Sequence, residues 1–167
     1  MTDDGAVVVL IGAPGAGKTR TAKRVARRLE LPVIDTDKTI VAEHGPIAGI
    51  FAEHGEPHFR ALERAAVQRA LAERAVVSLG GGAVLDPGTQ ADLAGRRVVQ
   101  LTMTPEAAAL RVTDPKRPLS SDPEAWARLV AARQPIYDRL AGLTIDTSSQ
   151  PLDRVAQQIV DWLESTA

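Results

Sequence analysis

The sequence contains no cysteine and no long apolar run, and each absence excludes a class of protein. Without cysteine the chain can form neither disulfide bonds nor thiolate metal sites, and it has no cysteine nucleophile. No apolar run approaches the roughly 18 residues of a membrane span. The N-terminal segment MTDDG is acidic, whereas a secretory signal peptide begins with basic residues. We therefore expect a soluble, cytoplasmic protein.

The chain also lacks an excess of charge of either sign. Its net charge is −1 and its pI is about 6.3, so it has no general attraction for nucleic acids or anionic lipids. We expect neither as a partner. Lysine is scarce as well, since sixteen of the twenty basic residues are arginines. Arginine suits bidentate binding of carboxylates and phosphates, although most of these side chains must lie on the surface.

Short apolar runs alternate with longer helical patterns along the 167 residues, a length typical of one domain. Runs rich in valine and isoleucine favour a parallel sheet covered on both faces. Strands are predicted at residues 6–11, 32–34, 75–79, 98–101 and 143–146. Helices are predicted at residues 18–29, 59–73, 104–111, 123–140 and 151–163. This alternation indicates an α/β fold, and the loop-like segment 112–123, VTDPKRPLSSDP, is typical of a mobile lid.

Residues 12–19, GAPGAGKT, match the phosphate-binding loop pattern G-x-x-x-x-G-K-[ST], with an apolar run before them and a helical pattern after them. The glycines let backbone N–H groups surround the phosphates of a nucleoside triphosphate, and the following helix points its positive end at them. Lys18 would bridge phosphate oxygens, and the Thr19 hydroxyl would ligate Mg²⁺.

Asp35 and Asp37 follow the second predicted strand, in the segment VIDTD. Residues i and i+2 of a strand share a face, so both carboxylates would emerge at the carboxyl edge of the sheet, beside the phosphates. One would hold water on Mg²⁺, and the other would accept a hydrogen bond from a substrate hydroxyl. The alternative is that Asp37 caps a helix beginning at Lys38 and Asp35 is merely exposed.

Three consecutive glycines, residues 80–82 in SLGGGAV, follow the third predicted strand and leave backbone N–H groups open to a ligand. A flexible link between strand and helix would look the same. Arg60, Arg117 and Arg133 are further candidates, because converging guanidinium groups would bind a carboxylate and the transferring phosphate. Each alone is also compatible with a solvated surface side chain.

The motifs GAPGAGKT, IDTD, FRALE, SLGGGAV, RPL and RQPIY occur in this order along nearly the whole chain. This series resembles shikimate kinase. The resemblance implies one P-loop kinase domain over residues 1–167, with a three-layer αβα sandwich around a five-stranded parallel sheet of order 2-3-1-4-5. It also implies a lid at about 112–123 and a shikimate-binding helical segment at about 38–65. The implied reaction is ATP-dependent phosphorylation of the 3-hydroxyl of shikimate, in aromatic amino acid biosynthesis, by a monomer that uses Mg²⁺.

The resemblance also assigns roles to single residues. Lys18, Asp37 and Arg117 would be catalytic, and Thr19 and Asp35 would hold the metal ion. Shikimate would be bound by Asp37, Arg60, Gly80, Gly81, Gly82 and Arg133. ATP would be bound by Gly15, Ala16, Gly17, Lys18, Thr19, Arg20, Arg111, Arg117 and Gln150. The segment between Arg111 and Arg117 is about one residue shorter than in the family, so Val112 is an alternative to Arg111 at the adenine.

Other interpretations remain for parts of the pattern. Another small-molecule kinase, such as a gluconate kinase, has a similar phosphate-binding loop, and a non-catalytic ATP-binding module would need only that loop. His54 and His58, in HGEPH, have the i, i+4 spacing of a metal-binding pair. Gly55 and Pro57 would break the helix that such a pair needs, so surface histidines are the favoured interpretation.

Overall fold

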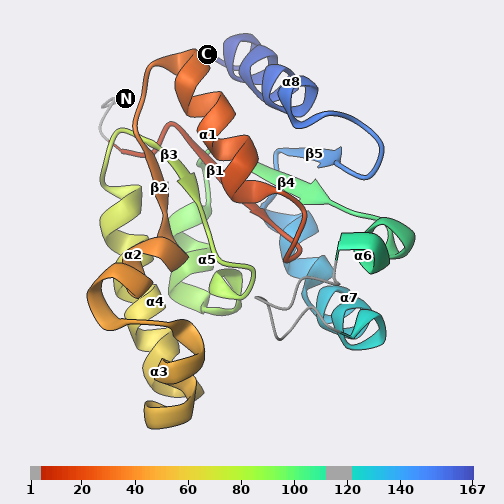
Figure 1. Ribbon diagram of the computed structural model, residues 1–167. Coiled ribbons are helices and arrows are strands. Elements are labelled where there is room, and N and C mark those ends of the chain that lie inside the picture. The colour runs from red at the N-terminus through yellow and green to blue at the C-terminus, as the bar shows by residue number, and fades with distance from the viewer. Residues whose placement is uncertain (1–4, 112–121) are drawn as a thin grey trace.

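The computed structural model describes residues 5–111 and 122–167, and a five-stranded parallel sheet lies at its centre (Figure 1). The strands are β1 (Val8–Gly12), β2 (Val33–Asp35), β3 (Val76–Ser78), β4 (Val98–Thr102) and β5 (Leu143–Asp146). Their order is β2-β3-β1-β4-β5, which confirms the predicted topology. All neighbouring strands pair in parallel, with Leu10 opposite Ser78 on one side and Val99 on the other.

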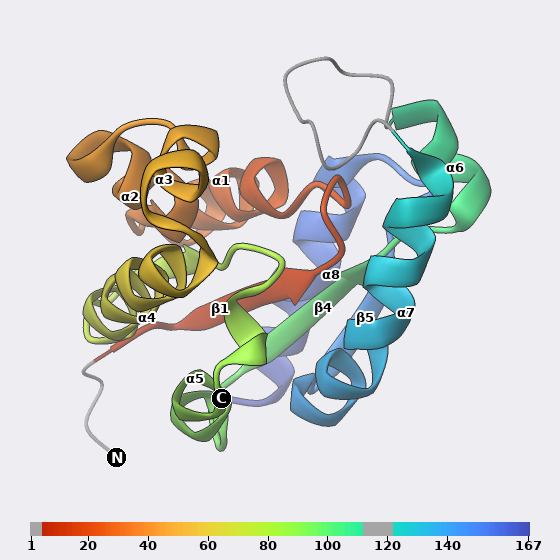
Figure 2. The ribbon, with the colours of Figure 1, turned by 90° about the horizontal axis from the view of Figure 1, so that it is seen from below.

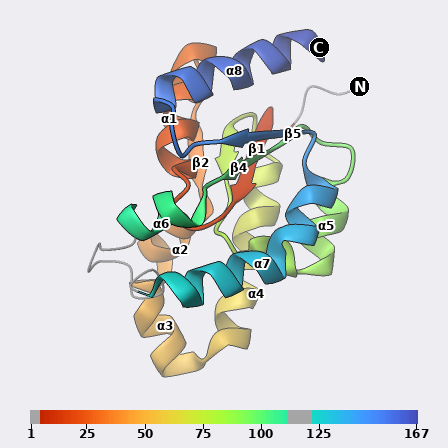
Figure 3. The ribbon, with the colours of Figure 1, turned by 90° about the vertical axis from the view of Figure 1, so that its right-hand side faces the viewer.

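Helices cover both faces of the sheet (Figure 3). They are α1 (Lys18–Leu29), α2 (Thr36–His44), α3 (Ile47–His54), α4 (Glu56–Leu71), α5 (Pro87–Leu93), α6 (Pro105–Arg111), α7 (Pro123–Leu140) and α8 (Leu152–Ser165), with a 3₁₀ turn, η1, at Ala83–Leu85. One core lies between the sheet and α1 and α8, and a second lies between the sheet and α4, α5 and α7. Alternate residues of β1 enter the two cores, which explains its unbroken apolar sequence. In the described parts of the chain, no helix has both the length and the hydrophobicity of a membrane span.

The segment predicted as helical at about 38–65 is divided into α2, α3 and the first half of α4. Gly45 and Gly55 end the first two of these helices, and their φ angles of 87° and 83° favour glycine. Ile40, Ile50 and Phe59 form a third, small apolar core among the three helices. These elements therefore make a lobe beside the sheet, which we call the α2–α3 lobe (Figure 1).

The carboxyl ends of the parallel strands meet at one edge of the sheet, where ligands of open α/β sheets bind. Figure 2 shows the α2–α3 lobe on one side of this edge and α6 and α7 on the other. Most of the predicted lid, residues 112–121, lies outside the described residues, and so does Arg117. The remaining two residues form the start of α7. The Asp122 side chain caps the helix by accepting a hydrogen bond from the N–H of Glu124 at 3.0 Å, and Pro123 is its first residue.

Candidate active site

The phosphate-binding loop joins the end of β1 to the start of α1. Gly15 and Gly17 have φ angles of 86° and 88°, in the left-handed region that glycine adopts without strain. Gly12 also has a positive φ angle, 136°, and in addition a Cβ there would lie 2.2 Å from the carbonyl oxygen of Leu101. The Lys18 ammonium donates hydrogen bonds to the carbonyl oxygens of Gly12 (2.8 Å) and Ala13 (3.1 Å). The loop therefore holds one positive charge beside the N-terminus of α1.

The loop that follows β5 packs against the phosphate-binding loop. The Thr147 hydroxyl donates a hydrogen bond to the carbonyl oxygen of Ala16 at 2.9 Å. The Arg111 guanidinium reaches both loops, donating to the carbonyl oxygens of Thr147 (2.7 Å) and Gly15 (3.4 Å). The Gln150 amide donates to the carbonyl oxygen of Asp146 at 2.8 Å. Both predicted adenine-site residues thus lie at this end of the sheet.

Among the described residues, the Arg20 side chain makes no such contact, although it was also predicted to bind the nucleotide. The Arg20 side chain is exposed on α1, and its backbone carbonyl accepts a hydrogen bond from Arg24 at 3.0 Å. Val112, the alternative to Arg111, lies outside the described residues. Which of the two residues lies at the adenine stays a prediction, and the structure places Arg111 between the two loops.

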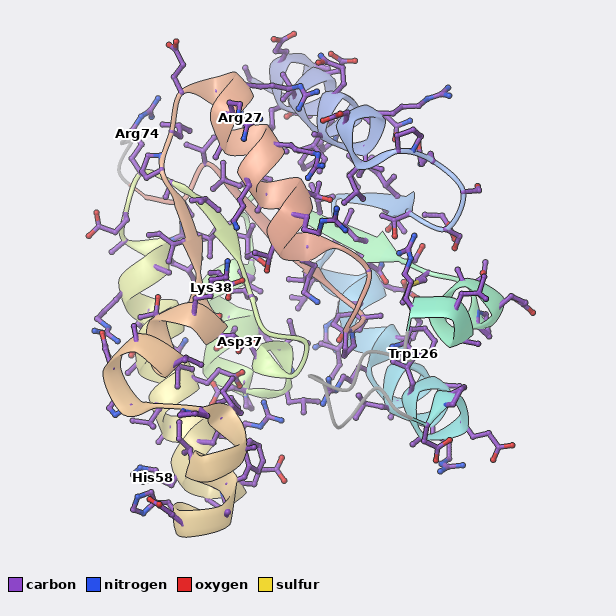
Figure 4. The ribbon with its side chains drawn as sticks, viewed as in Figure 1. Arg27, Asp37, Lys38, His58, Arg74 and Trp126 are labelled. Atoms are coloured by element: carbon purple, nitrogen blue, oxygen red, sulfur yellow. The ribbon has the colours of Figure 1, made fainter. Side chains whose placement is uncertain are left out.

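The prediction that Asp35 and Asp37 share one strand face is wrong. Asp35 is the last residue of β2, and its carboxylate caps α2 by accepting a hydrogen bond from the N–H of Lys38 at 3.1 Å. Asp37 lies in the first turn of α2. The alternative prediction placed a helix cap at Asp37. A carboxylate does cap the helix, but it is that of Asp35, because α2 begins at Thr36. Figure 4 shows Asp37 at this start of α2.

Asp35 and Thr19 form a pair of oxygen ligands suited to Mg²⁺. The Thr19 hydroxyl donates a short hydrogen bond to the second carboxylate oxygen of Asp35. Mg²⁺ prefers oxygen ligands and is usually held by one or two protein groups together with phosphate oxygens. Within residues 5–111 and 122–167, no three His, Asp or Glu side chains converge as in an all-protein metal cage. The pair fits a nucleotide-bound Mg²⁺ rather than a permanently bound ion.

The loop of glycines 80–82 follows β3 and lies against three predicted substrate-binding side chains. A Cβ on each glycine would meet a different one, namely Asp37 Oδ1 at 2.5 Å from Gly80, Arg133 Nη1 at 3.3 Å from Gly81, and Arg60 Nη1 at 2.5 Å from Gly82. None of the three glycines has a positive φ angle. They are therefore needed for the space they leave. The structure brings one carboxylate and two guanidinium groups together around a single loop, one residue to each glycine.

Glu63 belongs to this cluster, and sequence reasoning gave it no role. Its carboxylate accepts a hydrogen bond from Arg60 Nη1 at 2.7 Å, and its side chain is only 5% exposed. Burial raises the pKa of the Glu63 carboxyl, Arg60 and Arg133 lower it, and Asp37 raises it further. The sequence does contain one indication of this ion pair, because Arg60 and Glu63 have the i, i+3 spacing that places two side chains on one face of a helix.

Helix α7 holds both loops in place through two residues that sequence reasoning also left without a role. The Tyr137 hydroxyl donates a hydrogen bond to the carbonyl oxygen of Gly81 at 2.6 Å. The Trp126 indole donates to the carbonyl oxygen of Pro14, in the phosphate-binding loop, at 2.9 Å. Burial raises the pKa of the Tyr137 phenol, although the nearby Arg133 guanidinium lowers it. Arg133 lies between Trp126 and Tyr137 in the sequence of α7, and its side chain is also buried.

Three features are typical of a P-loop kinase of small molecules. They are the phosphate-binding loop after β1, the pair of Thr19 and Asp35 beside it, and the cluster of Asp37, Arg60 and Arg133 around the glycine loop. The sequence comparisons specify the family. The shikimate kinase family model matches residues 14–164. Shikimate kinases from Thermobifida fusca and Streptomyces avermitilis are 47% and 44% identical over 162 residues, covering 94% of this chain and 94% and 95% of theirs. The chain belongs to the shikimate kinase family.

Solved structures agree with this assignment. Shikimate kinase from Acinetobacter baumannii, solved in complex with shikimate, superposes with a TM-score of 0.90 at 29% identity, covering 97% of this chain and 94% of that one. A gluconokinase from Sinorhizobium meliloti has a TM-score of 0.67 at 19% identity, covering 100% of this chain and 95% of that one. At that identity the second similarity shows a shared fold alone.

Proposed function

We propose that this chain transfers the γ-phosphoryl group of ATP to the 3-hydroxyl of shikimate, giving shikimate 3-phosphate and ADP. The observation that carries the proposal is the convergence of Asp37, Arg60 and Arg133 on the glycine loop beside the phosphate-binding loop. Shikimate is a carboxylic acid with several hydroxyl groups. Two guanidinium groups suit its carboxylate, and one carboxylate suits its hydroxyls.

Phosphoryl transfer requires in-line placement of the acceptor, neutralisation of charge and little covalent chemistry from the protein. In this proposal Lys18 and the N–H groups of residues 15–19 bind the phosphates, with Arg20, Arg111 and Gln150 on the nucleotide side. Arg117 would meet the transferring phosphate, a role that rests on the family resemblance. Thr19 and Asp35 would hold Mg²⁺, which supplies positive charge to the β- and γ-phosphates when bound.

Asp37 would accept a hydrogen bond from the hydroxyl that attacks the phosphate. In a loose transition state this hydroxyl loses its proton late, so aiming the oxygen is the larger part of the role. Arg60 and Arg133 would fix the opposite end of the acceptor through its carboxylate. Gly80, Gly81 and Gly82 leave the space in which these three side chains and the acceptor meet.

The proposal extends to a monomer with one domain that acts in the cytoplasm. The described residues of the proposed site all lie at one edge of a single sheet, which supports a site formed within one chain. The absence of cysteine suits a reducing compartment.

A coupled assay of ADP release with shikimate as acceptor tests the proposal, with the product identified by phosphorus NMR. We expect release that depends on shikimate and does not occur with gluconate. Arg133→Ala should raise the KM for shikimate, whereas Arg128→Ala, an exposed arginine on the same helix, should leave it unchanged. The assignment fails if shikimate does not stimulate ADP release, or if Lys18→Ala keeps near-normal turnover.

A further inference from the structure

All three histidines of the chain line one cavity on the α2–α3 lobe, outside the proposed active site. His44 comes from the end of α2, His54 from the end of α3 and His58 from the start of α4. Glu53 and the apolar side chain of Ile50 contribute to the same cavity. Figure 4 shows His58 at the outer end of this lobe, well away from Asp37. Phosphoryl transfer gives this group of imidazoles no role.

The break in the helix does not separate His54 from His58. Helix α3 ends at His54, Gly55 turns the chain with φ 83° and ψ 170°, and α4 begins at Glu56. After this turn the two imidazole ring centroids lie 4.5 Å apart, with their planes tilted by 39°. The predicted break of the helix at Gly55 and the predicted exposure of both histidines are therefore confirmed, and the two rings meet across the break.

The separation of the rings fits two imidazoles bound to one metal ion. A metal–nitrogen bond of about 2.1 Å plus about 1.1 Å from that nitrogen to the ring centre places each centroid about 3.2 Å from the ion. Two such ligands at 90° have centroids about 4.5 Å apart, and at the tetrahedral angle about 5.2 Å apart. The observed 4.5 Å is compatible with the 90° arrangement, and it is also the spacing of an ordinary ring contact. Octahedral or square-planar ions, such as Ni²⁺ and Cu²⁺, have this angle between neighbouring ligands.

The surroundings of the pair favour a cation and define its protein ligands. Glu53 Oε2 lies 3.8 Å from His54 Nε2, so a negative charge stands beside the rings. Because no group of three metal-binding side chains converges in the described parts of the chain, water would complete the coordination. His44 lies 3.6 Å from Glu43, which Arg69 also holds with two hydrogen bonds. The close ring contact joins His54 and His58 and does not include His44, so His44 serves as a control from the same cavity.

We propose that His54 and His58 form a binding site for a late first-row divalent cation of the Ni²⁺ and Cu²⁺ type, which fastens the end of α3 to the start of α4 across Gly55. Imidazole nitrogen binds these ions more strongly than Zn²⁺ and far more strongly than Mg²⁺, which prefers oxygen. The site is therefore chemically distinct from the proposed Mg²⁺ pair. It also lies on the helix that carries Arg60, two residues beyond His58.

The test is a calorimetric titration of the untagged full chain with NiCl₂, without nucleotide and with Mg²⁺ in excess. We expect one ion per chain. His54→Ala or His58→Ala should each weaken binding by about tenfold or more, and His44→Ala should leave it within about threefold. Ni²⁺ should also raise the thermal midpoint of the wild type and of the His44 variant, but not that of the other two.

Two results would overturn the proposal. One is the absence of Ni²⁺ binding by the wild-type chain at millimolar concentration. The other is equal binding by the wild type and the variants at His54 and His58, which would place the ion elsewhere. The His54→Ala variant should fold like the wild type, because the His54 side chain is 54% exposed and its loss removes little packing. A difference in Ni²⁺ binding between the two proteins therefore reports the loss of the imidazole. Neither result depends on whether the chain phosphorylates shikimate.

Discussion

Replacing Gly82 by alanine should displace the guanidinium of Arg60 and weaken binding of the acceptor. The added Cβ would lie 2.5, 2.7 and 2.9 Å from Arg60 Nη1, Nη2 and Cζ, which is closer than carbon and nitrogen atoms can pack. Gly82 has φ −96° and ψ 0°, a conformation that alanine also adopts. The backbone can therefore stay in place, and the displacement falls on the flexible end of the Arg60 side chain.

The magnitude follows from the interaction that Arg60 would lose. A hydrogen bond to a charged group contributes about 1.5–3 kcal/mol, so losing one to the shikimate carboxylate should raise the KM for shikimate by about 10- to 150-fold. Turnover at saturating shikimate should fall much less, because Lys18 and the phosphate-binding loop are untouched. Steady-state kinetics with shikimate varied at saturating ATP measure both quantities.

Gly49→Ala is the matched control for this experiment. Gly49 lies in α3 of the same lobe, and a Cβ there would meet nothing within 4 Å. The KM for shikimate should stay unchanged, and the helix should gain about 1 kcal/mol of stability from the better helix former. A KM within twofold of wild type for Gly82→Ala, or equal increases in both variants, would refute the reasoning.

Three further variants test other parts of the site. Asp37→Asn keeps the shape and removes the charge, so the rate of shikimate phosphorylation should fall by about 10²-fold or more; a wild-type rate would exclude both the base and the charged orienter. Trp126→Phe removes the hydrogen bond to Pro14, so it should raise the KM for ATP and cost about 1 kcal/mol in the free energy of unfolding, and no change in either would contradict the anchoring role. Glu63→Gln tests the buried carboxyl, whose pKa is raised in the folded protein. The protonated carboxyl therefore stabilises the fold below the ordinary carboxyl pKa, and this stabilisation is lost as the pH rises through the raised pKa. Urea unfolding should therefore show that the stability of the wild type relative to this variant decreases as the pH rises above the ordinary carboxyl pKa of about 4, and an increase would contradict the assignment.

The sheet could be predicted because its signals are local. Unbroken runs of valine and isoleucine mark strands that are buried on both faces, and each predicted strand end lies within two residues of the observed one. The phosphate-binding loop is equally local, since its glycines and Lys18 lie within eight consecutive residues. The predicted topology and family rested on the order of several motifs rather than on any single one.

The α2–α3 lobe was harder to predict, because tertiary contacts determine its short helices. Helix α2 has almost no amphipathic pattern, since only Thr36 and Ile40 of its nine residues are buried. Its start was misplaced because a valine-isoleucine run followed by an aspartate looks the same whether the strand continues or a helix begins. Trp126 and Tyr137 were missed for a related reason. The partners of Trp126 and Tyr137 are backbone carbonyls of distant loops, which only the fold brings near and which carry no sequence signal. Glu63, which was also missed, differs, because its partner Arg60 lies three residues away on the same helix.

The position of Asp37 in α2 explains how the carboxylates of Asp35 and Asp37 can lie only two residues apart in the sequence. Had both lain on one strand face, they would have repelled each other at a single spot. Instead, the chain changes from strand to helix between them, and Thr36 is fully buried at the junction. Its hydroxyl accepts a hydrogen bond from the N–H of Gly80 at 3.2 Å and fixes the start of α2 against the glycine loop. Asp35 is thereby directed at Thr19 and Asp37 at Gly80, so that one buried residue separates the nucleotide side of the proposed site from the acceptor side.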